Sequence, residues 1–268
     1  MSSIKWNPPP EKPQNPKLDL PIRKIIAVGS GKGGVGKSTV AFNLACALAK
    51  SGQKAGLLDA DIYGPSVPKL TGLSGQGPSQ KDGKLIPLEA HGLKAMSIGF
   101  LVEEGKALIW RGPMIHKALF QMLQDVAWGT DAKPLDVLVI DLPPGTGDVQ
   151  LTLAQKVRLD GAVIVSTPQD LALADARRAV EMFRTTGVPI LGLIENMSTH
   201  ICSNCGHEEH IFGHGGAQEE ASKLNVPFLG EIPLSAGIRE KSDRGEPAQA
   251  ERFQEIADRL KSSPALQN

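Results

Sequence analysis

Residues Val28 to Val40 read VGSGKGGVGKSTV, a stretch that fits two glycine-rich nucleotide-binding patterns at once. Gly31, Gly33 and Gly36 spell the G-x-G-x-x-G of dinucleotide-binding folds, whereas Gly31, Gly36, Lys37 and Ser38 spell the G-x-x-x-x-G-K-[ST] of a phosphate loop. A phosphate loop needs an ammonium group beside the β- and γ-phosphates and a hydroxyl on Mg²⁺, and a dinucleotide site needs neither. Because Lys37 and Ser38 supply both groups, the stretch predicts a phosphate loop between a strand and a helix.

Three aspartates near predicted strand ends favour the same interpretation. Asp59 lies about where a dinucleotide fold keeps its ribose-binding acid, but Asp61 follows two residues later, and one ribose needs only one acid. The apolar run LDVLVID ends in Asp141, as a strand that carries a Walker-B aspartate does. The dinucleotide alternative leaves Asp61 and Asp141 without a role.

The chemistry of phosphate binding then assigns a role to each residue. Backbone N–H groups and the helix N-terminus form an anion cradle from Gly33, Gly34, Val35, Gly36, Lys37, Ser38 and Thr39. Lys37 offsets phosphate charge, Asp61 is the candidate for orienting the attacking water, and Mg²⁺ is expected at Ser38, Asp59 and Asp141. Gly145, in PPGTGD, is expected in a switch that senses hydrolysis. Asp148 either relays that switch toward the C-terminal part of the chain or is only the N-cap of the next helix.

The composition excludes several classes of protein. The 268 residues carry 29 Lys and Arg against 29 Asp and Glu, so the overall charge predicts no nucleic-acid partner and no anionic-membrane partner. No apolar run approaches the roughly 18 to 20 residues of a membrane span. The N-terminal stretch has neither the apolar centre of a signal peptide nor the pattern of a transit peptide. We therefore expect a cytoplasmic protein with reduced thiols.

Short apolar runs alternate with helical patterns from Arg23 onward. Seven runs are apolar on both faces and are expected as buried, parallel strands: residues 24–28, 54–61, 93–99, 135–141, 161–167, 189–197 and 227–233. Helices are expected over residues 39–52, 114–128 and 250–260. The predicted fold is a three-layer α/β sandwich with a mostly parallel central β-sheet, the P-loop NTPase fold.

The remaining segments define the predicted domain organisation. Residues 1–21 form a proline-rich, flexible tail, and residues 22–268 form one domain. Within that domain, Tyr63 to Gly92 is rich in glycine and proline and is predicted to be a long loop beside the nucleotide. Trp110 and Arg111 are candidates for a dimer face, although a half-buried tryptophan is the simpler explanation.

Two of the three cysteines lie in a segment rich in metal-ligand residues, residues 200–214. Cys202 and Cys205 form C-x-x-C in HICSNCGHEEHIFGHGG, whereas Cys46 is expected in the core. Three interpretations stay open: a zinc site completed by two of His207, His210 and His214, a redox dithiol, and an iron–sulfur cluster. A [4Fe–4S] cluster normally takes four thiolates, so it would need the pairs of two chains.

The motifs together resemble a known family. GKGGVGKST looks like the deviant Walker A of the SIMIBI-class ATPases, which include MinD, ParA and the nitrogenase iron protein. DADIYGPSVP, DLPPGTGD, TPQDLALAD, ENMS, CSNCG and LGEIPL follow in the order found in the Mrp/ApbC family, over roughly residues 23 to 250. The resemblance implies ATP and Mg²⁺ as cofactors, slow ATP hydrolysis, and a [4Fe–4S] cluster that is transferred to apo iron–sulfur proteins.

The resemblance also implies roles for individual residues. Lys32 crosses a homodimer interface to the partner's nucleotide, unless it contacts the phosphates of its own chain's nucleotide or is merely solvated. Cys202 and Cys205 of two chains bridge the cluster. Asn196 reads the adenine edge and Pro233 and Leu234 pack against the base, while the plainer alternative for Asn196 is a strand-end turn. Two other functions stay open: a MinD/ParA-like spatial-organisation ATPase and a zinc-stabilised ATPase switch.

Overall fold

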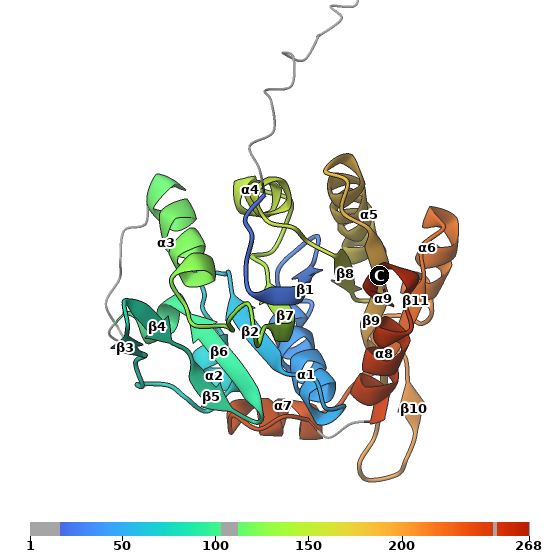
Figure 1. Ribbon diagram of the computed structural model, residues 1–268. Coiled ribbons are helices and arrows are strands. Elements are labelled where there is room, and N and C mark those ends of the chain that lie inside the picture. Colours follow the sequence, from blue (N-terminus) through green and yellow to red (C-terminus); the bar gives the residue numbers. More distant parts are fainter. Residues whose placement is uncertain (1–16, 103–111, 249–250, 268) are drawn as a thin grey trace, which may run out of the picture.

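The computed structural model describes residues 17–102, 112–248 and 251–267 (Figure 1). Most of the predicted tail, and both Trp110 and Arg111, lie outside these residues. At the end of the tail, Leu18 N–H donates to the carbonyl of Lys156 at 2.8 Å and Leu20 packs against the core. Contacts with the folded body therefore begin before the predicted boundary at residue 22.

A central sheet organises the described part of the chain, where it contains nine strands in the order β10-β9-β8-β1-β7-β2-β6-β5, with β11 also paired to β9. The strands of this sheet are β1 (Ile22–Gly29), β2 (Ala55–Asp59), β5 (Leu88–Ala90), β6 (Leu93–Ser97), β7 (Leu135–Asp141), β8 (Gly161–Ser166), β9 (Ile190–Ile201), β10 (Glu208–Glu209) and β11 (Phe228–Leu234). Only β5 and β10 pair antiparallel with their neighbours. All seven predicted strands are present, and most of their residues are buried because helices cover both faces.

Helices form a layer on each side of the sheet, so the three-layer prediction is confirmed (Figure 1). One layer holds α3 (Gly112–Gln124), α4 (Asp148–Lys156), α5 (Asp170–Thr185) and α6 (Gly216–Leu224). The other holds α1 (Lys37–Lys50), α2 (Val67–Leu70), α7 (Ala236–Asp243), α8 (Glu251–Lys261) and α9 (Pro264–Gln267). No helix in the described ranges has the length and apolar character needed to cross a bilayer.

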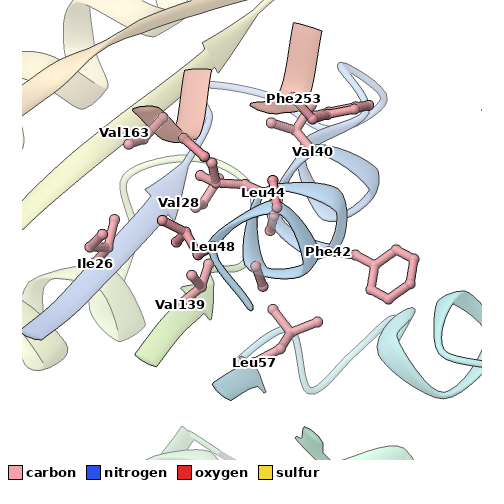
Figure 2. Close-up of a cluster of buried hydrophobic side chains, with 14 of the residues drawn as sticks. Ile26, Val28, Val40, Phe42, Leu44, Leu48, Leu57, Val139, Val163 and Phe253 are labelled. Atoms are coloured by element: carbon pink, nitrogen blue, oxygen red, sulfur yellow. The ribbon is translucent and has the colours of Figure 1, made fainter. Parts of the chain in front are cut away.

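Helix α1 is the centre of one apolar core (Figure 2). Its Leu44 and Leu48 lie against strand residues such as Val28 and Val139, while Phe253 of α8 covers the helix from outside. These side chains are at most 2% exposed. The helix that follows the phosphate loop is therefore stabilised mainly by the burial of its apolar side chains, and less by the intrinsic helix propensity of its residues.

The prediction of a continuous loop from Tyr63 to Gly92 is wrong. This segment contains the short helix α2, a hairpin of β3 (Ser79–Lys81) and β4 (Lys84–Ile86), and strand β5. Helix α3 also ends earlier than predicted, at Gln124, because the next residues leave the helix to pair with β4 through Ala127 N–H to the carbonyl of Leu85, 2.8 Å. Trp128 is then buried in the core, with its indole N–H donating to the carbonyl of Met122.

Candidate functional site

The phosphate loop joins β1 to α1 at the carboxyl end of the parallel strands, where ligands of open α/β sheets bind. Gly36 is the N-cap of α1 and has a left-handed φ of 79°. A Cβ atom there would stand 2.2 Å from Nδ2 of Asn196. That amide donates to the carbonyl of Val35 at 2.8 Å, so glycine is needed both for the turn and for the close approach of β9.

Lys37 and Asp141 form a buried ion pair below this loop. The ammonium Nζ is 2.5 Å from Oδ1 of Asp141 and 3.3 Å from Oγ of Ser38. The other carboxylate oxygen of Asp141, Oδ2, is buried and has no hydrogen-bond partner among the described residues. A buried, unused carboxylate oxygen beside a serine hydroxyl is a donor set that suits Mg²⁺. The residues present therefore fit the predicted ion.

Asp59 lies beside Asp141 in the register of β2 and β7 and is fully buried. Its Oδ1 accepts a hydrogen bond from Asp61 N–H at 3.1 Å, and its Oδ2 accepts from Ser66 N–H, Val67 N–H and Ser97 Oγ at 3.0 to 3.1 Å. Burial, with a contribution from Asp141, raises the pKa of Asp59 to about 7. Asp59 therefore anchors residues 61–67, and its predicted place at Mg²⁺ remains a prediction.

Asp61 lies where that anchored segment meets the predicted switch. Burial raises the pKa of its carboxyl group, Lys37 opposes the rise and Asp141 adds to it. Asp61 lines a cavity of about 580 Å³ together with Tyr63, Pro144, Asp148 and other residues of the two segments. The structure thus brings the candidate for orienting water next to the candidate switch.

The switch segment is held by a residue that sequence reasoning missed. The side-chain amide of Gln150 donates to the carbonyls of Pro143, Pro144 and Gly145, at 2.8 to 3.2 Å, and Gly145 N–H donates to the carbonyl of Ser30 at 2.9 Å. The only sign of this role in the sequence was a glutamine within the helical pattern that follows PPGTGD. Asp148 is the first residue of α4, whose N-cap is Gly147, so the N-cap interpretation is wrong by one residue.

A second cavity, of about 440 Å³, opens beside the start of α1. The predicted residues Gly36, Ser38, Thr39, Asn196, Pro233 and Leu234 all line it. The strand-end alternative for Asn196 is wrong, because β9 continues to Ile201. Residues of α2 and α7, among them Lys69 and Arg239, complete the walls, and nothing in the sequence links these short helices to a nucleotide.

Lys32 makes its described contact within its own chain. Its Nζ is 3.5 Å from Oε1 of Gln169, the N-cap of α5, and its backbone carbonyl accepts from the hydroxyl of Ser30. Leu171, two residues after Gln169 in the first turn of α5, is 70% exposed.

The cysteine pair lies in the turn of the β9–β10 hairpin, which extends beyond the body of the molecule (Figure 1). Cys202 N–H donates to the carbonyl of His207, and Gly206 N–H donates to the carbonyl of Cys202, both at 2.9 Å. Both thiols are free, Cys205 is exposed, and backbone N–H groups of Cys205 and Asn204 lower the pKa of Cys202. Burial instead raises the pKa of Cys46 to about 12, as expected for a core position.

The histidines of the segment do not complete a zinc site with these thiols. Within the described part of the chain, the one converging set of three or more possible metal ligands is Glu195, His214 and Glu231, and it contains neither cysteine. A four-ligand Cys₂His₂ set within one chain is therefore not assembled.

Comparison with known proteins finds relatives that are named as iron-transfer or iron-sulfur cluster carrier proteins. Residues 21–263 match the ParA family model described as NUBPL iron-transfer P-loop NTPase. The iron-sulfur cluster carrier protein of Salmonella typhimurium is 54% identical over 248 residues, which cover 89% of this chain and 66% of that protein. The iron-sulfur cluster transfer protein NUBPL of Mus musculus is 49% identical over 257 residues, covering 91% and 79%. The chain thus spans just under two thirds of the length of the bacterial carrier.

Solved structures agree on the fold. The nucleotide-binding protein of Archaeoglobus fulgidus, in complex with ADP and found to contain cobalt, superposes with a TM-score of 0.73 at 41% identity and covers 92% of each chain. The cell-division ATPase MinD of Pyrococcus furiosus superposes with a TM-score of 0.65 at 21% identity, over 90% of this chain and 99% of that one.

Proposed function

The chain belongs to the NUBPL iron-transfer family of P-loop NTPases, and from this premise we propose that it is an ATP-dependent carrier of [4Fe–4S] clusters. In this proposal the cluster is the cargo. It is held between two copies of the chain and handed to apo iron–sulfur proteins, and ATP hydrolysis drives the change between holding and releasing.

The observation that carries the proposal is the path of β9. This strand places Asn196 in the cavity beside the phosphate loop and, six residues later, ends in the turn that presents Cys202. A nucleotide that displaces the Asn196 amide from the carbonyl of Val35 acts on the same strand that holds the cluster-binding turn. One continuous element therefore couples the two sites, without any intervening domain.

The residues around the phosphate loop support hydrolysis. Lys37 moves from Asp141 to the β- and γ-phosphates, which frees the Asp141 carboxylate. Ser38 and Asp141 would hold Mg²⁺, and the ion would supply positive charge to offset the charge that develops on the phosphates. Asp61, fixed through its N–H by Asp59, orients the attacking water.

Two chains are needed because of the number of thiolates. A [4Fe–4S] cluster takes four cysteine ligands, and each chain offers two in its hairpin turn. Ile201 and Ile211 flank that turn and are 57% and 51% exposed, which supports apolar packing around a shared cluster. The lowered pKa of Cys202 favours the thiolate that iron requires.

Anaerobic reconstitution with iron and sulfide tests the proposal. We expect a brown chromophore that accounts for about four irons per two chains, counted as the iron lost together with the chromophore in the cysteine variant, because each chain supplies two ligands. The chromophore should be lost in Cys202→Ala and kept in Cys46→Ala, the matched control for a cysteine outside the turn. Stoichiometric zinc in protein purified in air, with no chromophore after reconstitution, would overturn it.

Transfer to an apo-protein tests the role of ATP. Loaded wild-type protein with ATP should deliver its cluster faster than the Lys37→Ala and Asp61→Ala variants, as followed by the activity regained by an apo-enzyme that needs a [4Fe–4S] cluster. Equal rates in all three proteins would leave the carrier role intact and exclude the coupling to hydrolysis.

A further inference from the structure

Three possible metal ligands from separate segments converge on the face of the sheet that α6 covers. Glu195 lies on β9, Glu231 lies opposite it on β11 in the parallel register, and His214 precedes α6. One ligand atom from each lies within 4.8 Å of the other two. Figure 1 shows β9, β11 and α6 next to one another. Glu195 and Asn196 are consecutive residues of β9 and project to opposite faces of the sheet, because Glu195 contacts the start of α6 and Asn196 contacts the phosphate loop.

The most buried ligand is already oriented by the backbone. Oε1 of Glu195 accepts from Gly215 N–H at 3.1 Å, and Oε2 accepts from Ala217 N–H at 2.7 Å. A carboxylate has about four acceptor sites, so each oxygen keeps one free, and carboxylates that bind metals are commonly held by such hydrogen bonds. His214 stacks against His210 with ring centroids 4.4 Å apart, which restricts its ring as well.

Among the described residues, the charge of this cluster is met by backbone N–H groups at the start of α6 and by no basic side chain. Glu195 is fully buried and Glu231 is half-buried, yet among the described residues neither carboxylate has an ion-pair partner. Arg259 lies on the opposite face, beside Gly230, and donates to the carbonyl of Leu229, while Arg177 of α5 pairs with Glu220. Glu195 is buried, Glu231 is half-buried and His214 is exposed, and two carboxylates side by side repel each other unless a cation lies between them.

We infer that Glu195, His214 and Glu231 form a site for one divalent transition-metal ion, separate from the cysteine pair. Tetrahedral ligands at about 2.1 Å from one ion are about 3.4 Å apart, so ligand atoms within 4.8 Å of one another need side-chain movements of about 1 Å to close on one ion. One imidazole and two carboxylates suit Zn²⁺ or Fe²⁺ as a single ion, and not a thiolate-bound cluster. The ion would tie the loop that follows the cysteine hairpin to β9 and β11, on the strand that also carries Asn196.

Cobalt(II) is the probe that separates this site from the cysteine site. In the Cys202→Ala/Cys205→Ala double variant, titrated anaerobically, we expect one Co²⁺ per chain, with visible d–d bands and no sulfur-to-cobalt charge transfer. Adding His214→Ala or Glu231→Gln should weaken binding at least about tenfold, the loss typical of removing a metal ligand. His207→Ala, an exposed histidine of the same segment, is the matched control and should bind normally.

Two results would overturn the inference. One is failure of the folded double variant, verified by circular dichroism, to bind Co²⁺ stoichiometrically. The other is unchanged Co²⁺ affinity in both His214→Ala and Glu231→Gln. Because the cysteines are absent from every protein compared, the outcome is independent of whether the proposed carrier function holds.

Discussion

At the scale of single residues, Asp59 combines complete burial with four accepted hydrogen bonds and a pKa raised to about 7. An acid whose folded pKa lies above its ordinary value near 3.8 makes the folded protein bind the proton more tightly. Its stabilising contribution is complete below the ordinary pKa and is lost as pH rises through about 7.

The Asp59→Asn variant isolates this effect. We expect the stability advantage of the wild type over the variant to shrink between about pH 4.5 and pH 7.5, because asparagine does not titrate. The variant loses the bond to Asp61 N–H and should be less stable by roughly 1–3 kcal/mol at acid pH. Urea unfolding at several pH values measures the difference, and a difference independent of pH would contradict the raised pKa.

The cysteines differ in reactivity for reasons that are local to each residue. Backbone N–H groups lower the pKa of Cys202, and burial raises the pKa of Cys46 to about 12. Because the thiolate is the nucleophile, iodoacetamide near neutral pH should modify Cys202 at least about tenfold faster than Cys46. Mass spectrometry of peptides measures both rates. The rates should converge in denaturant, and similar rates in the folded protein would disprove the assignment.

Among single residues, motifs that carry their own chemistry identified positions that lie together in the structure, and the roles of these residues stay predictions. Lys37, Ser38 and Asp141 are brought together, and Asn196, Pro233 and Leu234 line one cavity, as predicted. Gln150 and the anchoring bonds of Asp59 were missed, because a glutamine in a helix or an aspartate that accepts backbone N–H groups leaves no pattern in one sequence.

At the scale of elements, long buried strands were predictable and short exposed ones were not. A strand such as β7 is apolar on both faces, whereas β3 and β4 have three residues each and are mostly exposed, so no periodicity marks them. Helix α2 begins where Asp59 accepts the N–H groups of Ser66 and Val67, a long-range contact that overrides the glycine- and proline-rich composition.

The turn that starts α1 can be tested with two glycines that share a backbone conformation. Gly34 and Gly36 have φ values of 81° and 79°, but only at Gly36 would a Cβ atom meet Asn196. Each alanine variant should lose roughly 1–2 kcal/mol from the left-handed conformation. Gly36→Ala should lose more, because it also breaks the bond from Asn196 to Val35. Chemical unfolding without nucleotide measures both, and equal losses would mean that the close approach of β9 does not matter.

At the scale of the whole molecule, the proposed dimer depends on Lys32. Among the described residues, the ammonium group of this lysine contacts the side chain of Gln169, at 3.5 Å, although the lysine lies in the phosphate loop itself. A lysine that serves its own nucleotide would be expected to lie toward the phosphates with Lys37. Its position beside the N-terminus of α5, near the exposed Leu171, instead fits a residue that faces a second copy.

Mixing two inactive variants tests whether Lys32 acts on the partner's nucleotide. In a mixed dimer of Lys32→Ala and Asp61→Ala chains, the phosphate loop of the Lys32→Ala chain keeps its own Lys37 and Asp61 and receives Lys32 from the other chain. That site is complete, and the second site lacks both groups. Random pairing makes half of the dimers mixed, each with one complete site, so ATPase activity should recover to about a quarter of the wild-type value in an isologous dimer. If Lys32 served its own chain, every site would lack one residue, and the mixture would be as inactive as its components.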